Sequence, residues 1–144
     1  MAVSVKTITL WRREVDNRSG ALAQTLEPLS RTGVDLSVLM GYRHPGGTTA
    51  TIELYPISSK KAAAAAGAAG LSPATIPTLL VVGDNRPGQA HAASKAIAEA
   101  GINLAFFLGQ VIGNKYSAVI GFETEADAKR AASLIKKATA SKRK

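Results

Sequence analysis

A five-residue motif occurs twice in this chain, and the spacing between its copies constrains the fold. Residues 16–20 read Asp-Asn-Arg-Ser-Gly, and residues 84–88 read Asp-Asn-Arg-Pro-Gly, 68 positions later. A constant offset over roughly sixty residues is typical of a duplicated structural unit. We therefore predict two repeats of one fold. The same offset relates Gly33 to Gly101, Leu36 to Leu104, Gly41 to Gly109 and Ile52 to Ile120.

Each repeat is short for an independent domain. The chain has 144 residues, and a unit of about half that length buries only a limited share of its surface on folding. We expect the two repeats to support each other and a second chain to associate with them. The predicted divisions are a first repeat at 1–74, a second repeat at 75–138 and a basic C-terminal tail at 139–144.

Secondary-structure signals follow the same order in both repeats. A strand, a helix, two strands joined by a turn and a second helix recur, which predicts an α+β fold. We expect two ferredoxin-like βαββαβ repeats, each an antiparallel sheet with its helices on one face. The predicted segments are strands 3–15, 34–42 and 48–55 with helices 20–32 and 58–69, then strands 78–82, 102–112 and 116–122 with helices 88–100 and 124–137.

The fourth strand of each predicted repeat is missing from this pattern. Only a short segment separates the second helix of the first repeat from the motif at residues 84–88. We therefore expect one segment, about 74–82, to serve both repeats as a strand. Residues 138–144 are too polar and charged to form a strand. The second repeat is therefore expected to lack its last strand and to expose a sheet edge. Open edges pair with other chains, which favours a homodimer.

The net charge of +8 is concentrated at the C-terminus. Residues 1–135 carry 13 basic and 10 acidic side chains, so the body of the protein is close to balanced. A solvated basic end explains this pattern. The alternative is a ferredoxin-like nucleic-acid-binding protein that uses the tail, but its third strands, 48–53 and 116–121, do not match the aromatic-rich motif of RNA-recognition sheets. The basic residues at and just before this tail are Lys136, Lys137, Lys142, Arg143 and Lys144.

Several other classes of protein are disfavoured by the sequence. It contains no apolar run of the roughly 18 residues that a membrane span needs and no signal-peptide pattern at its start, so we expect a cytoplasmic protein. Cysteine is absent, which excludes disulfides and thiolate chemistry. No catalytic or nucleotide-binding motif occurs, and His44 and His91 have no matched partners. We expect no enzymatic activity, no metal and no cofactor.

The repeated loop carries the candidate binding groups. In each copy a strand ends, the chain turns and a helix begins near Gly20 or Gly88. Unpaired N–H groups and the helix dipole at such a point favour a carboxylate or a phosphate. Asn17 and Asn85 can donate and accept hydrogen bonds at once, as recognition of a zwitterion requires. The structural alternative is a helix-capping turn that binds no ligand.

On these loops, and on the Gly-apolar-polar-Leu segments 33–36 and 101–104, the chain resembles tandem ACT-domain proteins across residues 8–139. The resemblance implies βαββαβ regulatory modules that bind amino acids and pair side by side. Their ligand lies between the first loop of one domain and a strand of its neighbour. We therefore predict a small regulatory protein that binds an amino acid or a similar small carboxylate at ACT-domain interfaces.

The resemblance extends to residues of the serine-sensing ACT domain of phosphoglycerate dehydrogenase. Its loop asparagine corresponds to Asn17 and Asn85, and its strand asparagine to Asn103, where the first repeat has Asp35. Its histidine is absent, so serine specificity is not implied, and the second repeat is the better match. A dimerisation module without a ligand is the remaining alternative. The predicted ligand-binding residues are Asp16, Asn17, Arg18, Gly20, Asp35, Asp84, Asn85, Arg86, Pro87, Gly88 and Asn103.

Overall fold

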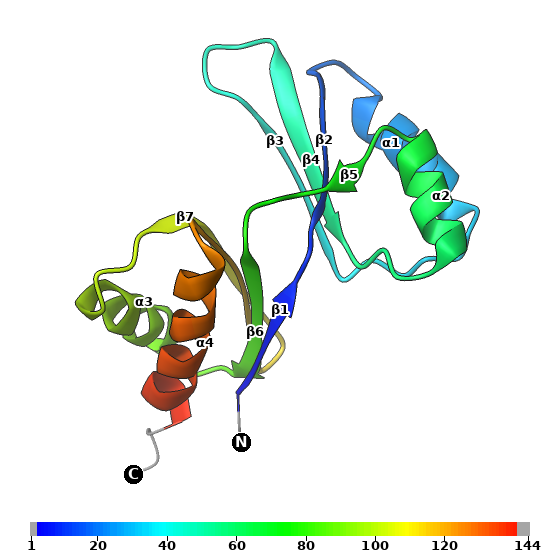
Figure 1. Ribbon diagram of the computed structural model, residues 1–144. Helices are drawn as coiled ribbons and strands as arrows, with labels where there is room; N and C mark the ends of the chain where they lie inside the picture. Colours follow the sequence, from blue (N-terminus) through cyan, green and yellow to red (C-terminus); the bar gives the residue numbers. More distant parts are fainter. Residues whose placement is uncertain (1–2, 141–144) are drawn as a thin grey trace. The chain divides into compact units, whose positions relative to one another are not determined.

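The computed structural model describes residues 3–140, which form two compact units. Residues 9–75 make up one unit, here called the first-repeat unit. Residues 3–8 and 76–140 together make up the other, the second-repeat unit. The chain therefore passes between the units twice, once after residue 8 and once after residue 75 (Figure 1). In the described part of the chain, no helix is long and apolar enough to cross a membrane.

The first-repeat unit is a four-stranded antiparallel sheet with two helices on one face (Figure 1). The strand order is β3-β4-β2-β5. Buried side chains of the sheet and both helices, among them Leu29, Ile52 and Leu54, form its core. The elements are β2 (Trp11–Asp16), α1 (Ala21–Ser30), β3 (Val38–Arg43), β4 (Thr49–Tyr55), α2 (Lys60–Ala68) and β5 (Ser72–Pro73).

The alanine-rich segment forms helix α2, as predicted. Its N-cap is Ser59, whose hydroxyl accepts a hydrogen bond of 3.0 Å from the N–H of Ala62. A serine at this position pairs one of the N–H groups that a helix start leaves open. Ala62 and Ala66 are buried, and their small side chains allow the helix to lie close to its neighbours.

The second-repeat unit also has two helices packed on a four-stranded sheet (Figure 1). Its strand order is β1-β6-β8-β7. Its core includes Leu79, Ile120 and Ile135 from the sheet and helix α4. That helix begins as predicted, because the Thr124 hydroxyl accepts a 3.0 Å hydrogen bond from the N–H of Asp127. The elements are β1 (Ser4–Ile8), β6 (Thr78–Asp84), α3 (Gln89–Glu99), β7 (Leu104–Ile112), β8 (Lys115–Phe122) and α4 (Glu125–Ala140).

The expectation that the second repeat lacks its last strand is wrong. Strand β1, at the start of the chain, pairs antiparallel with β6 in a register that runs from Ser4 opposite Val82 to Ile8 opposite Thr78. It takes the place of the fourth strand in the second-repeat unit. Both sheets therefore have the complete ferredoxin-like arrangement, and the predicted fold class of two βαββαβ repeats is confirmed.

The expectation of one strand shared by both repeats is also wrong. Strands β5 and β6 are separate and belong to different sheets. Strand β5 has only two residues and pairs with Trp11 and Arg12. Residues 13–16 of β2 therefore have no strand on that side among the described residues. The short edge strand occurs in the first repeat, opposite to the expectation, because the N-terminal strand completes the second.

The two units differ from the predicted divisions at both ends of the chain. The observed division at 75/76 lies one residue from the predicted 74/75 boundary, but residues 3–8 belong to the second-repeat unit. Helix α4 extends through Ala140, and Thr139 is buried within it. The first two residues of the predicted tail are thus helical, and residues 141–144 lie outside the described residues.

Candidate functional site

Each unit contains a pocket where the first strand, the following loop and the first helix meet. The two pockets occupy equivalent places in the repeat, and their volumes are about 210 Å³ in the first-repeat unit and 380 Å³ in the second. The first pocket is lined by Val15, Asp16, Asn17, Arg18, Ala21, Leu22, Gly41, Tyr42, Arg43, Ala50 and Thr51. The second is lined by Asn85, Arg86, Pro87, Gly88, Gln89, Ala90, Phe107, Gly109, Gln110, Val111 and Tyr116.

The N-termini of helices α1 and α3 are open toward these pockets. Gly20 and Gly88 occupy the N-cap positions with φ angles of 88° and 85°, and neither helix has a side-chain cap. Glycine adopts this left-handed conformation without the steric cost that a Cβ imposes. Within the described part of the chain, no partner accepts from the second and third N–H groups of either helix. Each helix start can therefore bind an anion.

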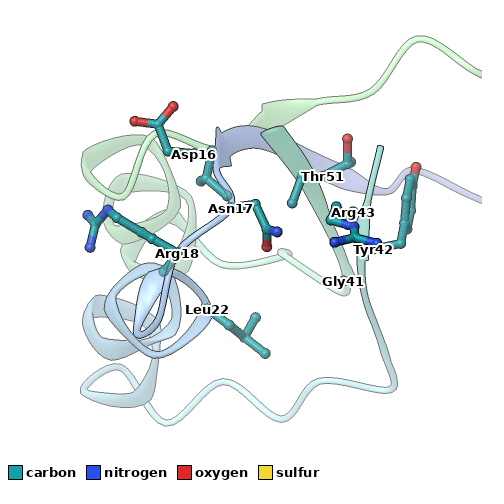
Figure 2. Close-up of a pocket in the computed structure, with 11 residues that line it drawn as sticks. Asp16, Asn17, Arg18, Leu22, Gly41, Tyr42, Arg43 and Thr51 are labelled. Carbon is teal, nitrogen blue, oxygen red and sulfur yellow. The ribbon is translucent and has the colours of Figure 1, made fainter. Parts of the chain in front are cut away.

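Backbone hydrogen bonds hold both loops against the neighbouring hairpin. The N–H of Asn17 donates to the carbonyl of Thr48 at 2.7 Å, and that of Asn85 donates to the carbonyl of Asn114 at 2.9 Å. Figure 2 shows the side-chain amide of Asn17 directed toward the side of the pocket where Gly41 and Arg43 lie. The loop asparagines thus line the pockets, and their role in binding stays a prediction.

The charged loop residues are mostly engaged elsewhere. Arg18 donates to the Gln24 side chain at 3.0 Å, and Arg86 donates to the carbonyl of Thr139, also at 3.0 Å. In Figure 2 the side chains of Asp16 and Arg18 point away from the Asn17 amide.

Asp84 is also engaged outside its pocket. Its carboxylate forms a 2.8 Å ion pair with Lys115, and the hydrogen bond from Lys115 lowers the pKa of Asp84. It is not among the residues that line the second pocket. This carboxylate therefore stabilises the base of the loop.

The predicted strand-start residues lie far from the loops of their own units. Asp35 and Asn103 are exposed and precede β3 and β7. These strands run parallel to β2 and β6, because both pairs flank an antiparallel central strand. The loops therefore lie at the opposite end of each sheet, roughly 20–30 Å away for strands of these lengths. Completion of a site by Asp35 or Asn103 across an interface stays a prediction.

The end of the second strand supplies pocket residues that sequence reasoning missed. Residues 41–43 line the first pocket and residues 109–111 the second. The repeated glycines, Gly41 and Gly109, were the sequence signal for these residues, since a glycine inside a strand often marks a site where a ligand or another backbone approaches closely. A Cβ at Gly41 would meet no atom within 4 Å, so this position opens onto free space.

The walls of the two pockets differ in charge. Arg43 and Tyr42 border the first pocket, whereas Val111 and Gln110 occupy the equivalent positions of the second. This wall of the first pocket therefore carries a charged side chain, and the equivalent wall of the second is uncharged. Among the described residues, no group of three or more His, Cys, Asp or Glu side chains is arranged to hold a metal ion.

Comparison with known proteins finds this architecture in several solved structures. No protein-family model matches the sequence, and no curated protein sequence is similar to it. Among solved structures, a Bacteroides thetaiotaomicron protein superposes with a TM-score of 0.72 at 16% identity, covering 88% of this chain and 87% of that one. The ligand-free regulatory subunit of aspartate kinase from Thermus thermophilus gives 0.65 at 15% identity, with coverages of 96% and 97%.

A complete enzyme shows the same likeness over part of its length. Aspartate kinase from Synechocystis superposes with a TM-score of 0.62 at 20% identity, covering 95% of this chain but 26% of the enzyme. At these identities the likeness establishes the fold. The predicted fold of two ferredoxin-like βαββαβ repeats is confirmed, and these similar structures include a regulatory subunit of aspartate kinase.

Proposed function

We propose that this protein is a small regulatory protein that binds an amino acid or a similar small carboxylate in the strand–loop–helix pocket of each repeat. The observation that carries this proposal is the recurrence of the pocket. Each copy combines a loop asparagine, a glycine N-cap and an open helix N-terminus with a glycine of the second strand. The fold itself does not require any of these polar groups to line a pocket.

The chemistry of the pocket suits a zwitterion or a carboxylate. The unpaired N–H groups and the dipole at the helix start attract the carboxylate. The side-chain amides of Asn17 and Asn85 donate to that carboxylate or accept from an ammonium group. Arg43 adds a second positive group in the first pocket, where a bidentate contact with a carboxylate is available to a guanidinium.

Regulation would follow from a preference of the ligand for one assembly state. A ligand shifts an equilibrium only by the difference between its affinities for the two states. We propose that a second copy of the chain pairs with the first and that the ligand favours the pair. The likeness to the Thermus thermophilus regulatory subunit supports a regulatory role without catalysis.

Titration calorimetry of the full chain against the twenty amino acids is expected to detect binding by at least one of them. Because a side-chain hydrogen bond to a charged ligand contributes about 1.5 kcal/mol or more, Asn17→Ala with Asn85→Ala should weaken the Kd by about tenfold or more. Ser94→Ala, on helix α3 and bonded to its own helix at Ala90, is the matched control and should bind normally.

The Asn103→Ala variant separates two versions of the site. A loss of affinity comparable to that of Asn85→Ala would support a site completed at an interface. Unchanged affinity would support a pocket that is complete within one unit. An absence of heat with all twenty amino acids would overturn the amino-acid proposal.

A further inference from the structure

We infer that the pocket of the second-repeat unit selects an amino acid with an apolar side chain, and that Tyr116 is a specificity-determining residue of this pocket. This inference rests on the proposed function and names the ligand class for one of the two sites. It is carried by three differences between pockets that have the same backbone design: available space, wall chemistry and one buried hydroxyl group.

The second pocket has more space and a smaller side chain in the first turn of its helix. Ala90 lines it, whereas Leu22 occupies the equivalent position in the first pocket. Leu22 lies beside the first pocket in Figure 2 and is 42% exposed. The volumes, about 380 Å³ against 210 Å³, follow this difference. Only the second pocket lies within the usual size range of small-molecule sites, about 300–1,000 Å³.

The walls of the second pocket are apolar where the ligand side chain would lie. Phe107 and Val111 line it, and Val111 replaces the Arg43 of the first repeat. Arg86 is the one charged residue in its lining, and its guanidinium donates to the carbonyl of Thr139. A cationic ligand side chain would lose hydration here without gaining an opposite charge, which is costly. An acidic one would find only Arg86, whose guanidinium already donates to Thr139. Aliphatic and aromatic side chains avoid this cost.

The buried hydroxyl group of Tyr116 provides an independent indication of a ligand. Tyr116 is only 4% exposed and lines the pocket, yet its hydroxyl has no hydrogen-bond partner among the described residues. Such groups are rare in native proteins and call for an explanation. The first repeat has Thr48 at the equivalent position, so the fold does not require a tyrosine there.

A bound amino acid would supply the missing partner. A phenolic hydroxyl can donate to a carboxylate or accept from an ammonium group, and burial raises the pKa of Tyr116, which keeps its proton in place. Gln89, 6% exposed, also lines the pocket, and its amide nitrogen donates to the carbonyl of Asp84 at 3.4 Å. Its amide oxygen remains available to an ammonium group. These two polar groups would orient the ligand while the apolar wall selects its side chain.

Titration of the full chain with valine, leucine and phenylalanine, against glycine, aspartate and lysine, tests the ligand class. We expect the three apolar amino acids to bind more tightly than the other three. Tyr116→Phe should weaken their Kd by about 3- to 10-fold, the effect of one hydrogen bond. The same variant should not lower the Tm, because the hydroxyl has no partner in the free protein. A lower Tm with unchanged Kd would assign Tyr116 a structural role and overturn the inference.

Replacement of Ala90 by a larger residue tests whether the ligand uses the space in the second pocket. Ala90→Leu installs the first-repeat side chain at an exposed position and should reduce affinity for the apolar amino acids by at least about tenfold, as a filled pocket loses its ligand contacts. Ser94→Ala, on the same helix but outside the pocket lining, is the control and should leave that affinity unchanged. Binding of charged amino acids alone would overturn this inference and leave the proposed function standing. Binding of none of the twenty would overturn both.

Discussion

Deletion of residues 1–8 is expected to unfold the second-repeat unit while the first-repeat unit stays folded. Strand β1 pairs with β6 along five residues, and Val3 and Val5 pack against the core of that unit. Loss of these apolar contacts and of the strand hydrogen bonds should cost on the order of 3 kcal/mol or more. That is a large share of the stability of a small domain, about 5–15 kcal/mol in total.

Two measurements report on the two units separately in this experiment. Trp11, the single tryptophan, lies in β2 of the first-repeat unit, so its fluorescence should keep a cooperative transition in urea. Amide protection against hydrogen exchange in β6 and β8 should be lost. Protection that survives the deletion would contradict the assignment of β1 as a required strand.

Moving the deleted strand provides the control. Residues 3–8, joined after residue 140 by a flexible linker, should restore protection. The end of α4 and the start of β1 lie at the same end of the sheet: Thr139 contacts Arg86, just after β6, and Ser4 pairs with Val82 near the end of β6. The relocated strand would then follow α4 in sequence, as a fourth strand does in an ordinary βαββαβ chain.

Replacement of Arg12 by alanine is expected to destabilise the first-repeat unit by about 3 kcal/mol, as for other buried charges that lose their partner. The side chain of Glu53 is only 3% exposed, and its carboxylate pairs with the Arg12 Nε at 3.3 Å. Arg12 also donates to the hydroxyl of Thr51 at 3.2 Å. Without Arg12, an ionised carboxylate would remain buried with no opposite charge.

The pH dependence of this variant has a definite sign. Burial raises the pKa of Glu53 above its ordinary value of 4.5, while Arg12 acts to lower it. A raised pKa in the folded state means that the contribution of Glu53 to stability is fully present below about pH 4.5 and declines as pH rises through the folded-state pKa. Removal of Arg12 raises that pKa further. The free energy of unfolding that Arg12→Ala loses relative to wild type should therefore be largest at pH 7 and should become smaller toward pH 4.5.

Urea midpoints from Trp11 fluorescence at the two pH values provide the measurement. Arg12→Leu combined with Glu53→Leu is the matched control, because the second repeat has Leu80 and Gly121 at the equivalent positions and no ion pair there. Replacement of both partners leaves no unpaired charge and should recover most of the stability. Wild-type stability of Arg12→Ala at pH 7 would contradict the buried-pair argument.

Local signals were sufficient to predict much of the candidate site. Gly20 and Gly88 lie at the helix starts where the turn pattern placed them, and Asn17 and Asn85 line the pockets. Arg43 and Tyr116 were missed, because each reaches its loop only through strand pairing. Their side chains carry no local pattern that indicates a pocket.

The sequence by itself determined the duplication, the order of helices and strands, and the two loops, because these depend on local turn chemistry and on hydrophobic periodicity. Only the tertiary structure decided which sheet each strand joins. Residues 3–15 form one continuous strand pattern, yet Ser4–Ile8 completes the second-repeat sheet and Trp11–Asp16 belongs to the first. Strand propensity is a local property, whereas pairing depends on packing between segments distant in sequence. The same long-range pairing brings Arg43 to one pocket and Val111 and Tyr116 to the other, so the pockets differ chemically although their loops are nearly identical.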